Sequence, residues 1–476
     1  MKRLLLTATA LSLAACQATP TETTLQTAPQ LAPQAPSQQS DGVKAKNVIL
    51  FIGDGMGVST ITAARIYEGQ SQGKTGEEHS LSFETFPNVA MVKTYNLDAQ
   101  VPDSAGTASA MNTGLVTNIG AINVQPGNEA AGCRDETRPA PVKIMDLAEA
   151  AGLSTGIVTS TRITHATPAA VYAHSESRGF ERYSDMPNGA IEIGCLDIAE
   201  QLVRSDLEIA LGGGRQAFKP KTRGNDESLI DMWTERGEDY AYISNARELS
   251  ALDPTAKQRV LGLFSNSHLP YHVDRNAGKD PSLTELTAAA IDNLDARDTG
   301  YFLMVEGGRI DHAHHSTNAY RALTDTVEFA AAVQAAYERT DPNETLILVT
   351  ADHSHVFTIA GYPQRGNPIL GLAKRTNRDG ESKALEDAEG LPYTTLGYHN
   401  GPNQRDDSVL TDNAVQAQDY LQQTAVKMQS ETHSGEDVVL YGTGPGSERV
   451  SGSFHQAKIF DIIVDSLDIR GTDEGE

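Results

Sequence analysis

A serine in a run of small residues is the first candidate for chemistry in this sequence. Ser104 follows Pro102 and Asp103, and residues 105–110 are all small. A proline before an Asp-Ser pair predicts the start of a helix, where free backbone N–H groups attract anions. Such a pair most often only caps a helix. A chemical role for Ser104 therefore needs support from other parts of the chain.

A carboxylate stands at the end of the first apolar run. Asp54 lies between Gly53 and Gly55, and these glycines let other groups approach it closely. The spacing of the glycines is G-x-G-x-G, whereas a dinucleotide fingerprint requires G-x-G-x-x-G. A dinucleotide site is therefore not expected here.

Another apolar run is followed by a segment rich in histidine. Glu306 opens this segment, and Asp311, His314 and His315 come after it. Asp311 and His315 are four positions apart, on one face of a helical turn, so both can reach one metal ion. His314 is also close by spacing, and the periodicity does not choose between the two histidines.

A third apolar run ends in Asp352 and His353. In open parallel sheets the ligand site lies beyond the carboxyl ends of the strands. Three strands that each deliver a carboxylate or imidazole to one edge of a sheet are hard to explain by structure alone. The sequence therefore predicts a metal centre at that edge.

Parallel strands joined by helices are the elements that would position these groups. Apolar runs alternate with helical patterns along the chain, which predicts an α/β fold, and no internal repeat is visible. The expected buried strands are 47–52, 154–159, 207–211, 301–305 and 345–350. The expected helices are 58–69, 142–150, 196–204, 283–295 and 318–338.

The overall charge is strongly acidic. The chain of 476 residues is 39% hydrophobic, which is enough for a large core, and its net charge is −25. Such a surplus of negative charge argues against nucleic acid or an anionic membrane surface as a partner. Any affinity for phosphate must then come from a local cluster of cations.

The N-terminus has the pattern of an exported protein. Residues 1–15 resemble a signal peptide, and Cys16 ends a stretch that resembles a bacterial lipobox; a plain signal peptide is the alternative. Residues 16–45 then form a flexible linker rich in Pro, Ala, Gln and Thr. We therefore expect a periplasmic protein that is lipid-anchored to the outer membrane. Cys133 and Cys195 are expected to form a disulfide, which would close a loop of about 60 residues and stabilise the fold by roughly 4 kcal/mol.

Together these motifs resemble the alkaline phosphatase family from about residue 47 to the last helix. The matching segments, in the family's order, are 47–57, 101–114, 161–174, 306–315, 350–357 and 431–438. The resemblance implies a three-layer α/β sandwich, in which helices cover both faces of a long, mostly parallel central sheet. It places the catalytic domain at residues 46–470, with a surface insertion at about 363–430 and an acidic tail at 471–476. It also implies a homodimer.

The resemblance assigns two zinc ions and one magnesium ion to candidate ligands. The first zinc would be held by Asp311, His315 and His433, the second by Asp54, Asp352 and His353 with Ser104 completing its shell, and the third ion by Asp54, Thr167 and Glu306, beside His165. Family members carry either aspartate or histidine at the position of His165. An imidazole suits zinc better than magnesium, so the identity of the third ion stays open.

The implied activity is hydrolysis of phosphate monoesters through a phosphoserine intermediate on Ser104. A serine hydroxyl is nearly inert until a base or a cation activates it, and no histidine lies close to Ser104 in the sequence. Arg178 resembles the phosphate-binding arginine of the family, with Arg182 as its competitor. A guanidinium that grips two phosphate oxygens favours a monoester over a diester.

One departure from the family and two alternative functions remain. Animal members bind calcium through a Phe-Glu pair, but here Ser265 follows Phe264, which predicts that no calcium site is present. The alternative enzyme is a phosphodiesterase or sulfatase, although no C-x-P-x-R sulfatase signature surrounds residue 104. The alternative without catalysis is a lipoprotein that binds zinc or phosphate.

Overall fold

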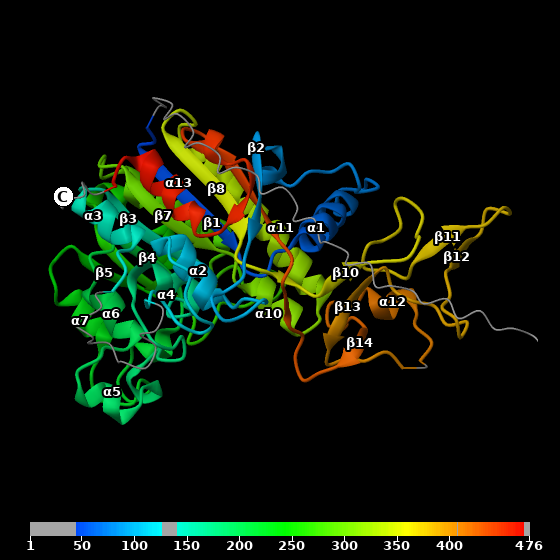
Figure 1. Cartoon of the computed structure of the whole chain (residues 1–476), viewed down its shortest axis with the longest axis horizontal. Helices are drawn as coiled ribbons and strands as arrows, with labels where there is room; N and C mark the ends of the chain where they lie inside the picture. Colours follow the sequence, from blue (N-terminus) through cyan, green and yellow to red (C-terminus); the bar gives the residue numbers. More distant parts are fainter. Residues whose placement is uncertain (1–43, 126–139, 407, 471–476) are drawn as a thin grey trace, which may run out of the picture. The chain divides into compact units, whose positions relative to one another are not determined.

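A ten-stranded sheet forms the centre of the molecule (Figure 1). The computed structural model describes residues 44–125, 140–406 and 408–470. The sheet contains β1 (Asn47–Gly53), β2 (Asn88–Lys93), β3 (Ser154–Arg162), β4 (Ile209–Gly213), β5 (Tyr240–Ile243), β6 (Arg259–Leu263), β7 (Tyr301–Glu306), β8 (Thr345–Ala351), β16 (Val438–Thr443) and β17 (Gly452–His455). Their order across the sheet is β17-β2-β16-β8-β1-β7-β3-β4-β6-β5.

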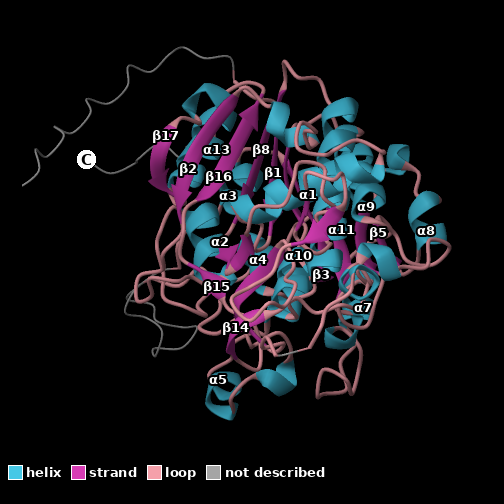
Figure 2. Ribbon diagram, turned by 90° about the vertical axis from the view of Figure 1, so that its right-hand side faces the viewer, coloured by secondary structure: helices cyan, strands magenta, loops and turns pink. Residues whose placement is uncertain are grey.

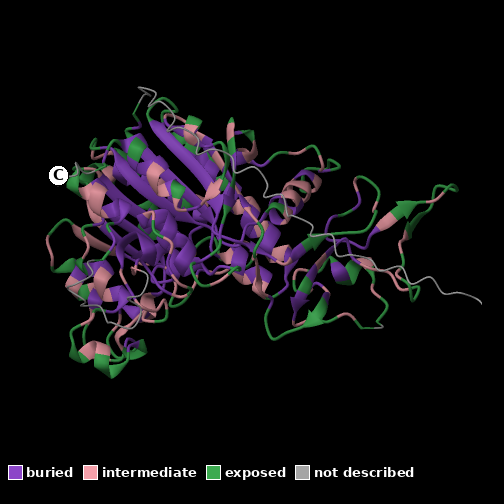
Figure 3. Ribbon diagram, in the orientation of Figure 1, coloured by how far each residue is buried: buried purple, intermediate pink, exposed green. Residues whose placement is uncertain are grey.

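The pairing in this sheet is mostly parallel. β16 runs antiparallel to β2 and β8, whereas the other neighbouring pairs in the sheet are parallel. β1, β7 and β8 are buried along their whole length, as expected for central strands that are covered on both faces (Figure 3). This explains why their sequences are continuous apolar runs.

Helices cover both faces of the sheet (Figure 2). One layer contains α1 (Val58–Ser71), α9 (Leu283–Asp295) and α11 (Ala319–Arg339). The other contains α2 (Ser104–Thr113), α3 (Ile144–Ala150), α4 (Ala166–Tyr172), α6 (Ile198–Arg204) and α13 (Lys458–Leu467). The remaining α-helices of the described residues are α5 (Asn188–Glu192), α7 (Leu229–Thr234), α8 (Ala246–Ser250), α10 (Arg309–His315) and α12 (Asp412–Val415). The predicted three-layer α/β sandwich is confirmed.

The segment after β8 leaves the main sheet and returns to it. It contains a three-stranded sheet of β10 (Phe357–Ile359), β13 (Leu396–Gly401) and β14 (Thr424–Lys427), and a hairpin of β11 (Lys374–Thr376) and β12 (Ser382–Ala384). At its base the short strands β9 (Ser354–His355) and β15 (His433–Ser434) pair with each other. This pair brings His355 and His433 together.

Several predictions concern parts of the chain that the structure does not describe. The signal peptide, Cys16, the linker up to residue 43, Cys133 and the acidic tail all lie outside the described residues. The anchor and the disulfide to Cys195 therefore stay predictions. Within the described ranges, no helix combines the length and the apolar character needed to cross a membrane.

Candidate metal centre

Ser104 lies at the beginning of α2, where the sequence predicted a helix start. Asp103 is the N-cap, and its side chain accepts a hydrogen bond of 3.1 Å from the backbone N–H of Gly106. The Ser104 side chain is buried; its Oγ is 3.3 Å from Nε2 of His353 and 3.5 Å from Oδ1 of Asp54. His353 is thus the spatial neighbour that sequence spacing could not reveal.

The order of the strands brings the predicted carboxylates to one edge. β1 lies between β7 and β8, so Asp54, Glu306 and Asp352 meet where these three parallel strands end. Gly55 has φ of +69°, and its backbone N–H donates a 3.0 Å hydrogen bond to Oδ1 of Asp352. A Cβ at this position would lie 2.4 Å from the ring of His355, which explains why a glycine is needed.

Asp311, His315, His355 and His433 form a group that we call the histidine cluster. One ligand atom from each of the four residues lies within 4.8 Å of all the others. Oδ1 of Asp311 is 3.3 Å from Nε2 of His315, 2.8 Å from Nε2 of His355 and 3.4 Å from Nε2 of His433. The helix α10 supplies two members, and the β9–β15 pair supplies the other two.

Hydrogen bonds to the backbone fix the tautomers of two of these histidines. Nδ1 of His315 donates to the carbonyl oxygen of Glu431 at 2.7 Å, and Nδ1 of His433 donates to that of Pro102 at 2.8 Å. Their Nε2 atoms therefore carry lone pairs, yet these atoms lie only 3.1 Å apart. Two lone pairs that face each other fit a shared cation, and this tautomer is the one that metal-bound histidines adopt.

His355 has a different environment, and its contribution was not predicted. Its Nε2 is 2.8 Å from Asp311, and its Nδ1 is 2.6 Å from Oε2 of the buried Glu431. Burial lowers the pKa of His355 to about 3 and raises the pKa of Glu431 to about 8. Because both ring nitrogens face carboxyl groups, His355 is placed to orient Asp311. Its position two residues after His353, on the same side of an extended segment, was the available sequence signal.

The structure separates the two neighbouring histidines between which spacing did not choose. Nε2 of His314 is 2.9 Å from the hydroxyl of Thr60, and its Nδ1 is 2.7 Å from the hydroxyl of Tyr398. Burial lowers the pKa of His314 well below its usual value, so the ring is neutral. Both of its nitrogens are engaged in hydrogen bonds, and His315 is the residue that faces the cluster.

A second group, which we call the carboxylate pocket, consists of Asp54, His165, Thr167 and Glu306. Ligand atoms of Asp54, His165 and Glu306 lie within 4.8 Å of one another, and all four side chains are buried. Oδ2 of Asp54, Nδ1 of His165 and Oε1 of Glu306 have no hydrogen-bond partner among the described residues. Leaving three buried polar atoms unsatisfied is costly, and a cation would satisfy all of them. The residues therefore fit a metal ion.

Electrostatics in the carboxylate pocket also favour a cation. Burial, together with the nearby carboxylates of Asp352 and Asp311, raises the pKa of Asp54 well above its usual value. Burial raises the pKa of Glu306 to about 7, although hydrogen bonds from Thr159 and other hydroxyls oppose this change. Like charges this close disfavour ionisation unless a positive ion lies between them.

The remaining predicted ligands connect the two groups. Asp54, Asp311 and His353 also offer ligand atoms within 4.8 Å of one another. Nε2 of His353 is 3.5 Å from Oδ2 of Asp352, and its Nδ1 is 3.2 Å from the carbonyl oxygen of Ser354. The unprotonated nitrogen of His353 therefore points towards the carboxylates and Ser104, which fits a further cation.

Arg178, and not Arg182, contacts Asp103, the residue before Ser104. Nη1 of Arg178 donates to Oδ2 of Asp103 at 3.0 Å, and its Nη2 is 3.1 Å from Nε2 of His165. Arg182 instead pairs with Asp185 at 3.0 Å, away from these contacts. Asp103 thus both caps α2 and holds the guanidinium, a second role that the sequence did not reveal.

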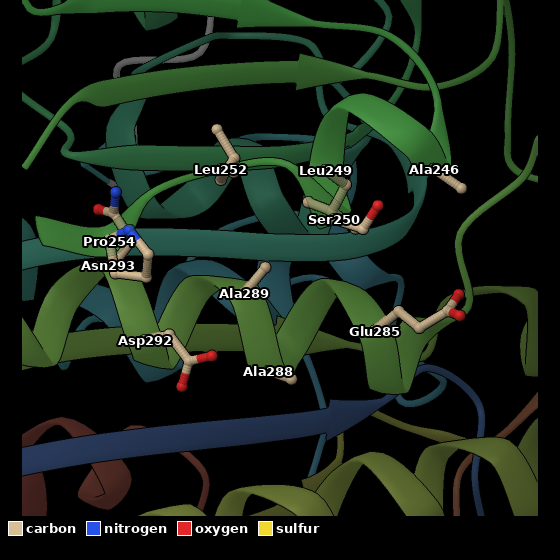
Figure 4. Close-up of a pocket in the computed structure, with 10 residues that line it drawn as sticks. All are labelled: Ala246, Leu249, Ser250, Leu252, Pro254, Glu285, Ala288, Ala289, Asp292 and Asn293. Carbon is tan, nitrogen blue, oxygen red and sulfur yellow. The ribbon is translucent and has the colours of Figure 1, made fainter. Parts of the chain in front are cut away.

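A pocket elsewhere in the fold lacks this combination of groups. It has a volume of about 270 Å³ and is lined by residues of α8, of α9 and of the segment between them, including Leu249 and Ala289 (Figure 4). Three alanines and two leucines make up half of its ten lining residues, and none of the ten is a histidine. It therefore offers no nucleophile next to a set of metal ligands.

The fold and this site define a class of metal-dependent α/β enzyme in which a serine lies beside clustered carboxylates and imidazoles. Residues 45–469 match the family model for alkaline phosphatase. The chain belongs to the alkaline phosphatase family, and it is a metal-dependent phosphoric monoester hydrolase.

Vertebrate enzymes and bacterial structures are among its relatives. The chain is 44% identical to the tissue-nonspecific isozyme of alkaline phosphatase from Gallus gallus, over 86% of this chain and 82% of that protein. It is 42% identical to the same isozyme from Homo sapiens, over 87% of this chain and 82% of that protein. A cold-active alkaline phosphatase from Shewanella sp. superposes with a TM-score of 0.64 at 26% identity, covering 88% of this chain and 99% of the other. A His-to-Asp variant of the alkaline phosphatase from the Antarctic bacterium TAB5, with Mg bound in its M3 site, superposes with a TM-score of 0.63 at 23% identity. This comparison covers 90% of this chain and 100% of the other.

Proposed function

We propose that Ser104 is the nucleophile and that hydrolysis proceeds through a phosphoserine intermediate. The observation that carries this proposal is the position of Ser104 Oγ, 3.3 Å from His353 and 3.5 Å from Asp54, at the beginning of a helix. Oγ attacks phosphorus in line as the bond to the leaving oxygen breaks, and the proton of Oγ passes through water to that oxygen. Water then attacks the same phosphorus, the bond to Oγ breaks, one proton of the water passes to Oγ, and phosphate leaves.

The side chains around Ser104 support this assignment by their charge. Arg178 would grip two non-bridging phosphate oxygens with its forked guanidinium, and Asp103 holds that fork in position. The backbone N–H groups of the first turn of α2 add further positive potential. A diester would place its second substituent where Arg178 binds, so we propose that monoesters of varied structure are the substrates.

We propose the following ions for the three groups of ligands. Asp311, His315 and His433 would hold one zinc ion, Asp54, Asp352 and His353 a second, and Asp54, Thr167 and Glu306 a magnesium ion beside His165. Bound there, these ions supply Lewis-acid stabilisation of the attacking and leaving oxygens and lower the pKa of a coordinated hydroxyl or water. Because His165 is an imidazole, zinc is the alternative for the third site. We expect no calcium, because Ser265 stands where a glutamate would be required.

The setting of the enzyme is also part of this proposal. We propose a homodimer that is exported to the periplasm and anchored by lipid on Cys16, with Cys133 and Cys195 joined by a disulfide. The N-terminal pattern and the composition of residues 16–45 support export and tethering.

The substitution Ser104→Ala tests the nucleophile. We expect hydrolysis of p-nitrophenyl phosphate by the metal-loaded protein to fall by about 10³-fold or more, with the metal content unchanged. Mass spectrometry of the acid-quenched wild type should locate the phosphoryl group on Ser104. Ser109→Ala is the matched control, because Ser109 lies buried on the same helix and bonds only to backbone groups of residues 105, 121 and 123.

Three outcomes would contradict this proposal. Near-normal turnover by metal-loaded Ser104→Ala would remove the nucleophile assignment, as would a phosphoryl group found on another residue. Faster hydrolysis of bis(p-nitrophenyl) phosphate than of the monoester would point to a phosphodiesterase instead.

A further inference from the structure

An asparagine in the loop between β2 and α2 contacts the residue that holds Arg178. Asn96 is 2% exposed, and its Nδ2 donates a hydrogen bond of 3.0 Å to Oδ1 of Asp103. The other oxygen of this carboxylate, Oδ2, accepts the 3.0 Å hydrogen bond from Nη1 of Arg178. One carboxylate therefore separates the amide of Asn96 from the guanidinium that is proposed to bind phosphate.

The carboxylate of Asp103 is charged, and its two oxygens have different partners. Oδ1 accepts from Asn96 and, at 3.1 Å, from the backbone N–H of Gly106. Burial favours the neutral form, but the charge of Arg178 and hydrogen bonds from the backbone of Gly120 and Gly106 hold the pKa of Asp103 below its usual value. Because two donors engage Oδ1, the carboxylate presents Oδ2 to Arg178.

The first turn of α2 leaves room for the amide of Asn96. A Cβ at Gly106 would lie 2.5 Å from Oδ1 of Asn96 and 2.6 Å from its Nδ2, so the glycine allows the amide to lie against the helix. Oδ1 of Asn96 is buried and has no hydrogen-bond partner among the described residues. A buried amide with an unsatisfied atom costs free energy, so packing alone does not explain why an amide occupies this place.

The hydrogen bond from Asn96 limits how Asp103 and Arg178 can pair. A carboxylate and a guanidinium often pair in a bidentate geometry, in which both oxygens accept hydrogen bonds from the fork. Here the fork is divided, because Nη1 bonds to Asp103 while Nη2 is 3.1 Å from Nε2 of His165. Without the donor from Asn96, Asp103 would be free to rotate and to pair with both nitrogens. That pairing would turn the guanidinium away from an incoming phosphate.

We propose that Asn96 is a positioning residue that acts through Asp103 and keeps Arg178 available for phosphate. Asn96 thereby sets the affinity of the enzyme for the phosphate group of both substrate and product, whereas the chemical step at Ser104 does not depend on it. The inference rests on the proposed roles of Ser104 and Arg178, and it adds a residue that the proposed chemistry does not use.

The substitution Asn96→Ala tests this inference on the full-length, metal-loaded protein. KM and kcat for p-nitrophenyl phosphate and the inhibition constant of inorganic phosphate are measured in the wild-type background and in Arg178→Ala. In the wild-type background we expect KM and the inhibition constant to rise by about 3- to 10-fold while kcat stays within about twofold, because phosphate binding is weakened in substrate and product alike. In the Arg178→Ala background the same substitution should change neither constant, since the group on which Asn96 acts is gone.

A second variant and a matched control accompany this substitution. Gly106→Ala adds a Cβ that would displace the amide of Asn96, so it should also raise the inhibition constant, while the backbone N–H of residue 106 is retained. Asn112→Ala is the control and should leave the inhibition constant unchanged. Asn112 is likewise buried, its Nδ2 donates to the carbonyl oxygen of Ala108 at 2.9 Å, and its Oδ1 also has no partner within the described structure.

The outcomes separate this inference from the proposed function. If the wild type does not hydrolyse p-nitrophenyl phosphate, or if Arg178→Ala binds phosphate as tightly as the wild type, the proposed function fails. If the wild type is active and Arg178→Ala weakens phosphate binding, but neither Asn96→Ala nor Gly106→Ala raises the inhibition constant, Asn96 does not position Arg178. An equal rise on substitution of Asn96 in the Arg178→Ala background would reveal a general structural effect and would also overturn the inference.

Discussion

The histidine cluster and the carboxylate pocket prepare for a cation in opposite ways. In the histidine cluster, hydrogen bonds to backbone carbonyls and to Glu431 fix each ring, so the ligand geometry is set by the protein. In the carboxylate pocket, one atom each of Asp54, His165 and Glu306 lacks a hydrogen-bond partner within the described structure. The first group is organised before an ion binds, whereas the second depends on the ion for its stability.

Asp311→Asn should have the largest effect on hydrolysis, because it changes the central residue of the histidine cluster. Its Oδ1 is the atom that Nε2 of His315, His355 and His433 all approach. An amide is a much poorer ligand, so we expect kcat/KM for p-nitrophenyl phosphate to fall by about 10³-fold or more, together with the loss of one zinc ion in metal analysis. Asp379→Asn, on the exposed turn between β11 and β12, is the control. Retention of full zinc content by Asp311→Asn would refute the assignment.

Glu306→Gln and Glu431→Gln compare the two groups directly. Glu306 would offer an unsatisfied oxygen to the proposed third ion, whereas Glu431 would act on the first ion indirectly, through His355 and through its carbonyl bond to His315. We expect Glu306→Gln to weaken binding of the third ion by about 10- to 100-fold, and Glu431→Gln to weaken the first ion less. Titration of each variant against a competing chelator measures both affinities. Equal losses in the two variants would contradict the difference between the two groups.

The pH dependence of stability should reverse when the ions are removed. Without ions, burial holds the pKa of Glu306 at about 7 and that of Glu431 at about 8, both above the values of an unfolded chain. Groups with a raised folded pKa stabilise the protein at low pH, and this stabilisation is lost as pH rises through that pKa. The metal-free protein should therefore become less stable between pH 6.5 and 8, because holding one carboxyl group protonated costs about 1.4 kcal/mol for each pH unit above its unfolded pKa.

The metal-loaded protein should show the opposite trend over the same range. Protons and cations compete for the same carboxylates, so deprotonation tightens binding and raises the unfolding temperature. Thermal unfolding at several pH values, with and without a chelator, checks both directions. Histidines with depressed pKa values, such as His355 at about 3, weaken the folded state only below about pH 6.5 and so do not interfere. Parallel curves for the two forms would contradict the prediction.

His165→Asp should have the smallest effect. Nδ1 of His165 is the orphaned nitrogen of the carboxylate pocket, and a carboxylate in its place favours magnesium over zinc. We expect the ratio of magnesium to zinc affinity at the third site to rise by about tenfold, measured by equilibrium dialysis with metal analysis. His174→Asn, at a half-buried histidine bonded to Lys143, is a control outside the pocket. An unchanged ratio would show that residue 165 does not select the ion.

The central part of the fold was predictable because its strands are buried on both faces. β1, β7 and β8 are uniformly apolar, and their predicted ends differ from the observed ends by at most one residue. β2 was not predicted, because most of its residues alternate between buried and exposed, next to the edge strand β17. The short strands β9 and β15 could not be predicted either, since their pairing joins residues far apart in the chain.

The candidate site likewise contains residues that local sequence predicts and residues that it does not. Asp54, Glu306 and Asp352 follow strands, so their meeting follows from parallel topology. The roles of His355 and Glu431 depend on hydrogen bonds between distant segments, which no local pattern encodes. The roles of the ligands remain predictions until the metal measurements above are made.

The pairing of β9 with β15 has a consequence for how this enzyme could vary. The segment from β10 to β14 leaves and re-enters the molecule through this pair, so the proposed metal ligand His433 lies at the base of the segment. The segment between these two strands can be shortened, extended or replaced without moving His433. Sequence changes in this segment therefore alter the surface that it presents to substrates or partners, while the residues of the site stay the same.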